Sequence, residues 1–113
     1  MRRGDLVLAS AGSGYAGKPR PVLIVQDDAL EALSSVVVCP LSTTSPADGR
    51  IRLAVSATAD NGLAADCVIM TDKVTAVPTS KLGVVIGSLA RPQMRSVNHA
   101  LGLVLGFGQQ AAR

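Results

Sequence analysis

The chain has 113 residues, a formal net charge of +3 and 48% hydrophobic residues. This composition fits one folded domain over residues 1–113 and excludes a largely disordered chain. No apolar run approaches the roughly 20 residues of a membrane-spanning helix, and Arg2 and Arg3 are not followed by the apolar stretch of a signal peptide. We therefore expect a cytoplasmic protein without membrane contact.

In chain order, apolar runs predict strands at residues 6–9, 22–26, 36–39, 50–55, 67–77 and 84–89. The run at 22–26 is apolar almost throughout, which indicates burial on both faces, whereas residues 50–55 alternate as a half-exposed strand does. Pro40 and Pro78 should end the strands that precede them, because proline cannot donate to a sheet ladder. Asn61–Gly62 marks a turn between two strands.

A helix is predicted to close the chain, because Pro92 suits a first helical turn and apolar residues follow it at intervals of three and four. The apolar positions are Met94, Val97, Leu101, Val104 and Leu105. This helix should end near Gly106 and pack on the sheet, and the single histidine, His99, should lie on its surface. The predicted fold is a small, mainly β domain of five or six strands with one C-terminal helix.

The charges are distributed unevenly along the chain. Asp72 is the last acidic residue, residues 21–72 are net acidic, and both ends of the chain are basic. If the two ends meet in space, they form a basic surface suited to a polyanion. Ordinary solvated charge explains the same asymmetry equally well.

Few groups in the sequence are suited to chemistry. It contains no phosphate-cradling glycine fingerprint, no Cys/His metal spacing and no recognisable Ser/His/Asp triad. Cys39 and Cys67 both lie in strand-like apolar runs. Buried free thiols are therefore favoured over a disulfide or a reactive site.

The remaining candidate is an arginine combined with a hydroxyl-rich loop. Arg20 stands between Pro19 and Pro21, which hold it extended and aim its side chain at low entropic cost. A guanidinium placed in this way suits bidentate binding of phosphate. The loop at residues 42–45 follows the next strand and can donate to the same phosphate if both strands open at one end of the sheet. The residues alone slightly favour the alternative, an ordinary surface arginine beside a polar loop.

The order of several segments along the chain is more specific than any one of them. These segments are RGDLVLA, GKPRPVLIVQ, VVVCPLS, CVIMTDKVTAV and KLG, followed by the closing helix. In this combination, over about residues 2–106, the chain resembles the MazF/PemK family, the endoribonuclease toxins of bacterial toxin–antitoxin pairs.

The resemblance implies a fold, an activity and partners. The family fold is an SH3-like barrel, a strongly bent antiparallel sheet with a C-terminal helix, and it assembles as a homodimer that a cognate antitoxin protein inhibits. The implied activity is sequence-selective cleavage of single-stranded RNA without a metal or other cofactor. In this reaction the RNA 2′-OH attacks the neighbouring phosphate and leaves a 2′,3′-cyclic phosphate and a 5′-OH.

Individual roles are carried over by matching segments. Arg20 corresponds to the family's catalytic arginine, which stabilises charge on the phosphate. The hydroxyl that bonds the scissile phosphate is usually threonine in the family, and here either Ser42 or Thr43 fills this place. Asp72 matches an acidic residue that is either an acid/base group or a structural ion-pair partner. The residues implied to contact RNA are Tyr15, Lys18, Pro19 and Thr44.

Two other functions remain compatible with the sequence. CcdB-like toxins share the fold but bind DNA gyrase through the tip of the C-terminal helix, here residues 105–113, and cleave nothing. A degenerate family member would bind RNA or antitoxin without cutting, and the serine at position 42 keeps this reading open. The intact KPRP segment favours the ribonuclease.

Overall fold

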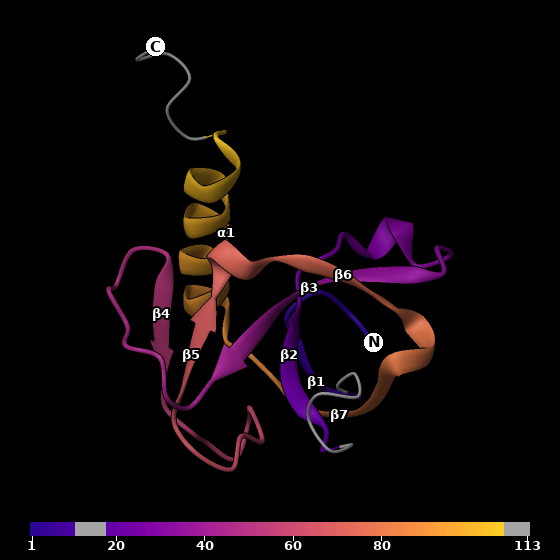
Figure 1. Ribbon diagram of the computed structural model, residues 1–113, viewed down its shortest axis with the longest axis horizontal. Helices are drawn as coiled ribbons and strands as arrows, with labels where there is room; N and C mark the ends of the chain where they lie inside the picture. Colours follow the sequence, from indigo (N-terminus) through magenta and orange to yellow (C-terminus); the bar gives the residue numbers. More distant parts are fainter. Residues whose placement is uncertain (11–17, 108–113) are drawn as a thin grey trace.

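The computed structural model describes residues 1–10 and 18–107, which form antiparallel strands and one α-helix (Figure 1). The strands are β1 (Asp5–Ala9), β2 (Arg20–Ile24), β3 (Ser35–Ser42), β4 (Arg52–Val55), β5 (Cys67–Met70), β6 (Thr75–Pro78) and β7 (Leu82–Ser88). The helix is α1 (Arg91–Leu105), and short 3-10 helices are η2 (Asp28–Leu30), η3 (Thr71–Lys73) and η4 (Thr79–Lys81). The predicted mainly β fold with a C-terminal helix is confirmed, and the described residues form seven strands rather than five or six.

The strand β3 organises the sheet because it pairs with three neighbours. Its first half pairs with β6, its middle pairs with β2, and its last two residues pair with β5. The strands follow the order β4-β5-β3-β2-β1-β7, with β6 beside β3. Since β3 changes its partner along one edge from β6 to β5, the sheet bends strongly, as the family resemblance implied.

Apolar side chains form two clusters on the two faces of the bent sheet. The larger cluster joins the sheet to α1 and includes Leu6, Leu23, Cys39, Ile69, Val97 and Leu101. The smaller cluster lies on the other face and contains Val7, Ala9, Val22, Ile24, Val36 and Val38. Successive residues of β2 supply both clusters, so the predicted burial of this strand on both faces is confirmed.

The prediction that Pro40 ends its strand is wrong, because β3 continues through it to Ser42. The Val37 carbonyl accepts a hydrogen bond from the Val25 N–H of the chain that follows β2, so alternate residues direct their polar groups to opposite edges. The backbone nitrogen and carbonyl of Pro40 are therefore directed to the edge of β3 that faces away from β2. There Pro40 falls between the last β6 pairing, at Val38, and the first β5 pairing, at Leu41. Proline's missing N–H costs no ladder bond at this gap.

The single strand predicted at residues 67–77 is divided into β5 and β6 by η3. Thr71, at the start of η3, is fully buried, and both its backbone N–H and its hydroxyl donate to the Ile51 carbonyl. These two bonds turn the chain from the end of β3 toward its beginning. Pro78 is the last residue of β6, where a strand tolerates proline.

The helix α1 agrees closely with its prediction. Val97, Ala100 and Leu101 are buried, His99 is exposed, and Gly106 ends the helix in the left-handed conformation with φ 83°. Both cysteines are free and buried, as expected. Among the described residues, no helix has the length and apolar character needed to cross a bilayer.

Candidate active site

A cleft opens where β2 and β3 separate. Val22 pairs with Pro40, so continuing this register by two residues sets Arg20 opposite Ser42. The β2–β3 pairing ends at Val22 and Pro40, however, while Ser42 stays paired with Val68 of β5 on the opposite edge of β3. This separation leaves a cleft of about 540 Å³. The cleft thus begins where the pairing of β2 with β3 ends.

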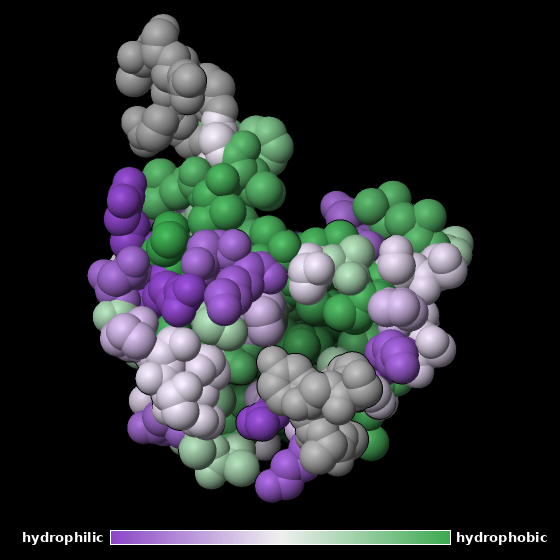
Figure 2. Space-filling model, viewed as in Figure 1, coloured by the Kyte–Doolittle hydropathy of each residue, from purple (hydrophilic) through white to green (hydrophobic). Residues whose placement is uncertain are grey.

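The cleft has an apolar floor and a polar rim. Its floor includes Val22, Val38 and Val77, which belong to or pack on the smaller apolar cluster. Figure 2 shows hydrophobic surface at the bottom of a hollow in the middle of this face, over β2 and β3. The polar residues of the cleft are Ser10, Arg20, Ser42, Thr43, Thr44, Ser45, Lys73 and Thr75. The structure therefore brings the predicted arginine and the predicted hydroxyl loop to one site.

Arg20 is the first residue of β2, and its backbone pairs with Ala9 of β1. This pairing and the following Pro21 fix the backbone from which the exposed arginine side chain extends. Lys18 and Pro19 are also exposed and lead directly into Arg20. Tyr15, the predicted base-stacking residue, lies outside the described residues.

Ser42 organises the loop that follows β3. Its Oγ accepts hydrogen bonds from the backbone N–H groups of Thr44 and Ser45, each at 3.1 Å, and lies 3.3 Å from the Thr44 Oγ1. Because the two N–H groups occupy the acceptor positions of this hydroxyl, its proton can be donated to the Thr44 Oγ1 or, in its place, to a bound phosphate. Thr43 is exposed on the same rim, and within the described chain its side chain makes no hydrogen bond.

Asp72 forms a two-pronged ion pair with Arg52 of β4. The Arg52 Nε and Nη2 donate to the two carboxylate oxygens of Asp72, each at 2.9 Å. These hydrogen bonds, with the positive charge of Arg52, hold the pKa of Asp72 below its ordinary value. Asp72 therefore stays ionised at neutral pH, and it is not among the described residues that line the cleft.

Lys73 lines the cleft, and the sequence analysis did not identify it as a site residue. The predicted continuous strand over residues 67–77 did not distinguish Lys73 from its neighbours. In the structure, η3 interrupts this strand and turns Lys73 toward the cleft. The sequence signal available was its position as the first cation after the last acid. Lys73 adds a second positive charge to the rim that carries Arg20.

The buried thiol of Cys67 also lines the cleft, but it is poorly suited to act as a nucleophile. Burial is the main cause that raises the pKa of Cys67, and its S–H donates to the Ala65 carbonyl at 3.3 Å. Burial raises the pKa of Cys39, in the core, to about 12. Among the described residues, no group of three or more His, Cys, Asp or Glu side chains is placed to hold a metal ion.

Comparisons with known proteins identify the family of the chain. Residues 2–105 match the family described as PemK-like, MazF-like toxin of type II toxin–antitoxin system. The chain is 43% identical over 107 residues to the probable endoribonuclease MazF of Mycolicibacterium smegmatis, covering 95% of this chain and 98% of that protein.

Solved structures give the same result. A mycobacterial endoribonuclease in complex with its cognate antitoxin is 25% identical, with a TM-score of 0.75 and coverage of 94% of this chain and 95% of that one. The Mycobacterium tuberculosis toxin MazF-mt6 is 28% identical, with a TM-score of 0.76 and coverage of 90% and 96%.

The fold, the cleft and these similarities define the class as endoribonuclease toxins of type II toxin–antitoxin systems. Within this class, the chain belongs to the PemK-like, MazF-like toxin family.

Proposed function

We propose that this toxin cleaves single-stranded RNA at selected sequences in the cleft between β2 and β3, without a metal or other cofactor. The RNA 2′-oxygen forms a bond to the adjacent phosphorus while the bond from phosphorus to the 5′-oxygen breaks. The 2′-OH loses its proton and the leaving 5′-oxygen gains one, which leaves a 2′,3′-cyclic phosphate and a 5′-OH. The observation that carries this proposal is the convergence of Arg20 and Ser42 on one cleft.

The chain's own groups have defined tasks in this reaction. The phosphorane that forms during attack carries more negative charge than the starting phosphate. The Arg20 guanidinium stabilises that charge by donating two N–H hydrogen bonds to the phosphate oxygens. Ser42 donates its hydroxyl proton to a phosphate oxygen, while the bonds it accepts from Thr44 and Ser45 hold the hydroxyl in position.

The surrounding residues bind the RNA on either side of the scissile phosphate. Lys73 and Lys18 supply positive charge for neighbouring phosphates, Thr43 and Thr44 supply hydroxyl donors, and Tyr15 stacks on a base. The apolar floor of the cleft favours unpaired bases, which expose their faces to contact, and so supports single-stranded RNA as the substrate.

We further propose that the toxin acts in the cytoplasm as a homodimer and that an antitoxin protein inhibits it. Apolar side chains remain exposed at the end of α1 and on β7, namely Val84, Val85, Leu105 and Phe107, with Phe107 76% exposed. Exposed apolar groups of this kind are typical of protein interfaces. A relative of this fold is known in complex with its cognate antitoxin.

The test compares Arg20→Ala with the wild type on a long single-stranded RNA. We expect cleavage to fall by about 10²–10³-fold or more, the loss typical when a donor to a developing oxyanion is removed, while circular dichroism and dimer mass stay unchanged. Arg50→Ala is the matched control, because Arg50 is also exposed but lies outside the cleft. If Arg20→Ala cleaved the RNA as fast as the wild type does, the proposal would be contradicted. A folded wild type that stops growth without cutting RNA would instead indicate a gyrase-type poison.

A further inference from the structure

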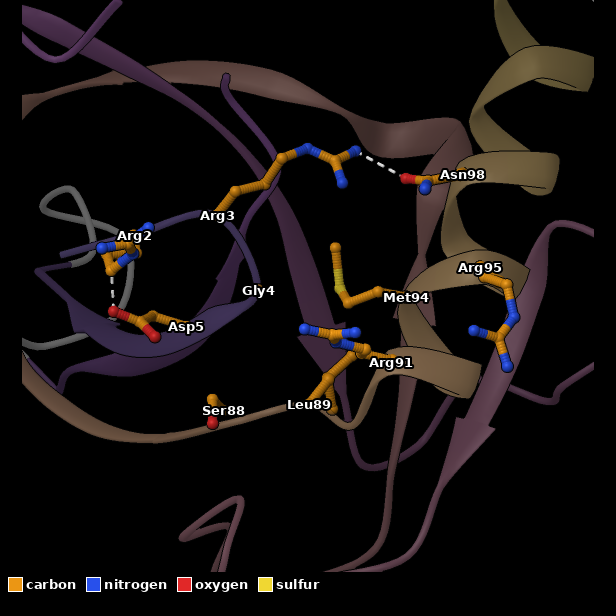
Figure 3. A pocket seen from close by; sticks show the side chains of 10 residues that line it. All are labelled: Arg2, Arg3, Gly4, Asp5, Ser88, Leu89, Arg91, Met94, Arg95 and Asn98. Carbon is orange, nitrogen blue, oxygen red and sulfur yellow. Dashed lines mark hydrogen bonds between the residues drawn. The ribbon is translucent and has the colours of Figure 1, made fainter. Parts of the chain in front are cut away.

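A second pocket lies at the other end of β1 from the cleft. It is formed by the N-terminal residues, the end of β7 and the first turns of α1, and its volume is about 440 Å³ (Figure 3). Ala9 of β1 lines the active-site cleft, whereas Asp5, the first residue of β1, lines this pocket. These two residues are four positions apart, which corresponds to about 13 Å along a strand.

The pocket is strongly basic because it collects charge from both ends of the chain. Its charged lining residues are Arg2, Arg3, Asp5, Arg91 and Arg95. The sequence allows the basic ends of the chain to meet, and in this pocket they do.

The existing contacts leave much of this positive charge without a neutralising carboxylate. Asp5 accepts a bond from the Arg2 backbone N–H at 2.8 Å. The Arg2 side chain, which is 81% exposed, forms an ion pair with Asp28, with 3.6 Å between the Arg2 Nη2 and the Asp28 Oδ2. The Arg3 guanidinium bonds two neutral acceptors, the Val25 carbonyl at 2.8 Å and the Asn98 Oδ1 at 2.6 Å. Arg3 is thereby held rigidly while keeping its charge.

Arg91 and Arg95 occupy positions in α1 where a positive charge lowers the stability of a helix. Arg91 and Arg95 are four residues apart, so their like charges repel on one face. Both lie near the N-terminus of α1, whose dipole disfavours cations, and the first turn contains no acidic residue. In Figure 3 the Arg91 side chain reaches into the pocket, and Arg95 lies at its outer side. Local choices that oppose helix stability are expected at functional positions.

The lining points to phosphate groups rather than to a protein partner. Leu89 and Met94 are the apolar side chains among the described residues of the pocket, and Leu89 is only 8% exposed. A protein partner needs buried apolar anchors, which this lining scarcely offers. Guanidinium groups with nearby hydroxyl and amide groups, here Ser88 and Asn98, are the usual means of holding a nucleic acid backbone.

We infer that this arginine pocket is a second RNA-binding site, which holds phosphates of the same strand that enters the cleavage cleft. The inference rests on the proposed function, because it takes the substrate to be single-stranded RNA. The length of β1 separates the two sites, so a single-stranded RNA segment of a few nucleotides is long enough to reach both. The pocket thus adds affinity for long RNA without contributing to the chemical step.

The test measures binding of a long, fluorescein-labelled single-stranded RNA by anisotropy, using full-length protein that carries Arg20→Ala. The test variant adds Arg91→Gln and Arg95→Gln. The matched control adds Arg91→Lys and Arg95→Lys, which keep both charges. Each single-strand phosphate contact contributes about 0.7 to the slope of log affinity against log salt, so the slope should shrink by about 1.4 in the glutamine variant. Between about 50 and 200 mM salt this is about a 7-fold change in its affinity relative to the parent.

The lysine variant should keep the parent slope. Equal slopes for the glutamine variant and the parent overturn the inference. It is also overturned if the glutamines leave RNA binding intact but abolish binding of poly-glutamate, since the pocket would then serve an acidic protein. RNA cleavage by the chain with its native Arg20 is followed in parallel. If the chain cleaves RNA but the glutamine variant and the parent have equal slopes, only the second binding site is rejected. If the chain neither binds nor cleaves RNA, the proposed function is rejected as well.

Discussion

At the scale of single residues, the site depends on how Ser42 is held rather than on its hydroxyl alone. Ser42 accepts bonds from two backbone N–H groups of its own loop, at Thr44 and Ser45. Thr43, the neighbouring candidate, is exposed at the rim, and among the described residues its side chain makes no hydrogen bond. We therefore assign the phosphate-binding hydroxyl to Ser42 as a proposal.

Substituting the two hydroxyl residues separately tests this assignment. We expect Ser42→Ala to lower kcat by about 10²-fold, because it removes a phosphate donor and loosens the loop that carries it. Ser42→Thr should retain most activity, since a threonine hydroxyl can make the same bonds, and Thr43→Val should cost less than Ser42→Ala. Single-turnover cleavage of one RNA by all variants provides the comparison. A larger loss for Thr43→Val than for Ser42→Ala would reverse the assignment.

The Asp72–Arg52 pair makes a prediction about pH. Arg52 lowers the pKa of folded Asp72, so the pair stabilises the fold above the unfolded pKa of about 3.9. That stabilisation is lost as the pH falls through the lower folded-state value. Asp72→Asn should therefore lower the Tm at pH 7, and the difference from wild type should vanish in strong acid. The cleavage pH profile should keep its shape. Loss of one limb of that profile, with an unchanged Tm, would instead make Asp72 an acid/base group.

Local signals, a proline pair and a hydroxyl run after a strand, made Arg20 and the Ser42 loop candidates, and the family resemblance selected them over an ordinary polar surface. The sequence could not resolve Asp72, since its partner Arg52 is 20 positions away in the chain. Lys73 was missed for a related reason. Its place at the cleft depends on the turn at Thr71, and that turn is fixed by a distant carbonyl, Ile51.

At the scale of elements, the chain between β4 and β5 is anchored by one buried amide. Asn61 is 2% exposed, and its side chain accepts from the N–H groups of Thr58 and Leu63 and donates to the Ser56 carbonyl. Gly62, at φ +69°, completes the turn predicted from the Asn–Gly pair and lies so close to Ile86 of β7 that a side chain would clash.

Removing this amide should destabilise the fold. We expect Asn61→Ala to reduce the free energy of unfolding by about 2–4 kcal/mol, because it leaves one buried and two partly buried backbone groups without their partner. Ser56→Ala is the control, since the Ser56 side chain is exposed and only its backbone carbonyl takes part, and it should change stability by less than about 0.5 kcal/mol. Urea unfolding of the three proteins measures both effects. Equal stabilities for Asn61→Ala and the wild type would show that the turn holds without its amide.

Element types followed well from the sequence, whereas strand ends did not. The helix was predicted with its end at Gly106 because apolar periodicity and a terminal glycine are both local. The continuation of β3 through Pro40 depends on which edge the proline nitrogen faces. That edge is set by the change of partner from β6 to β5, which no local pattern contains.

At the scale of the whole molecule, β1 links two positively charged regions. One is the cleft with Arg20 and Lys73, and the other is the arginine pocket at the start of α1. The basic ends of the sequence therefore meet in space, which was one of the two interpretations of the charge distribution. Only the fold shows which residues come together. A chain with these two regions on one strand suits an extended polyanion.

The proposed reaction, in which the RNA's own 2′-OH attacks the phosphate, determines which ends the cut RNA carries. The most direct measurement incubates the purified chain with a long single-stranded RNA in EDTA and maps the chemistry and position of the new ends. We expect discrete cuts at a short shared sequence, each leaving a 2′,3′-cyclic phosphate and a 5′-OH. Cuts that leave a 3′-OH and a 5′-phosphate, or cleavage that EDTA abolishes, would contradict the account.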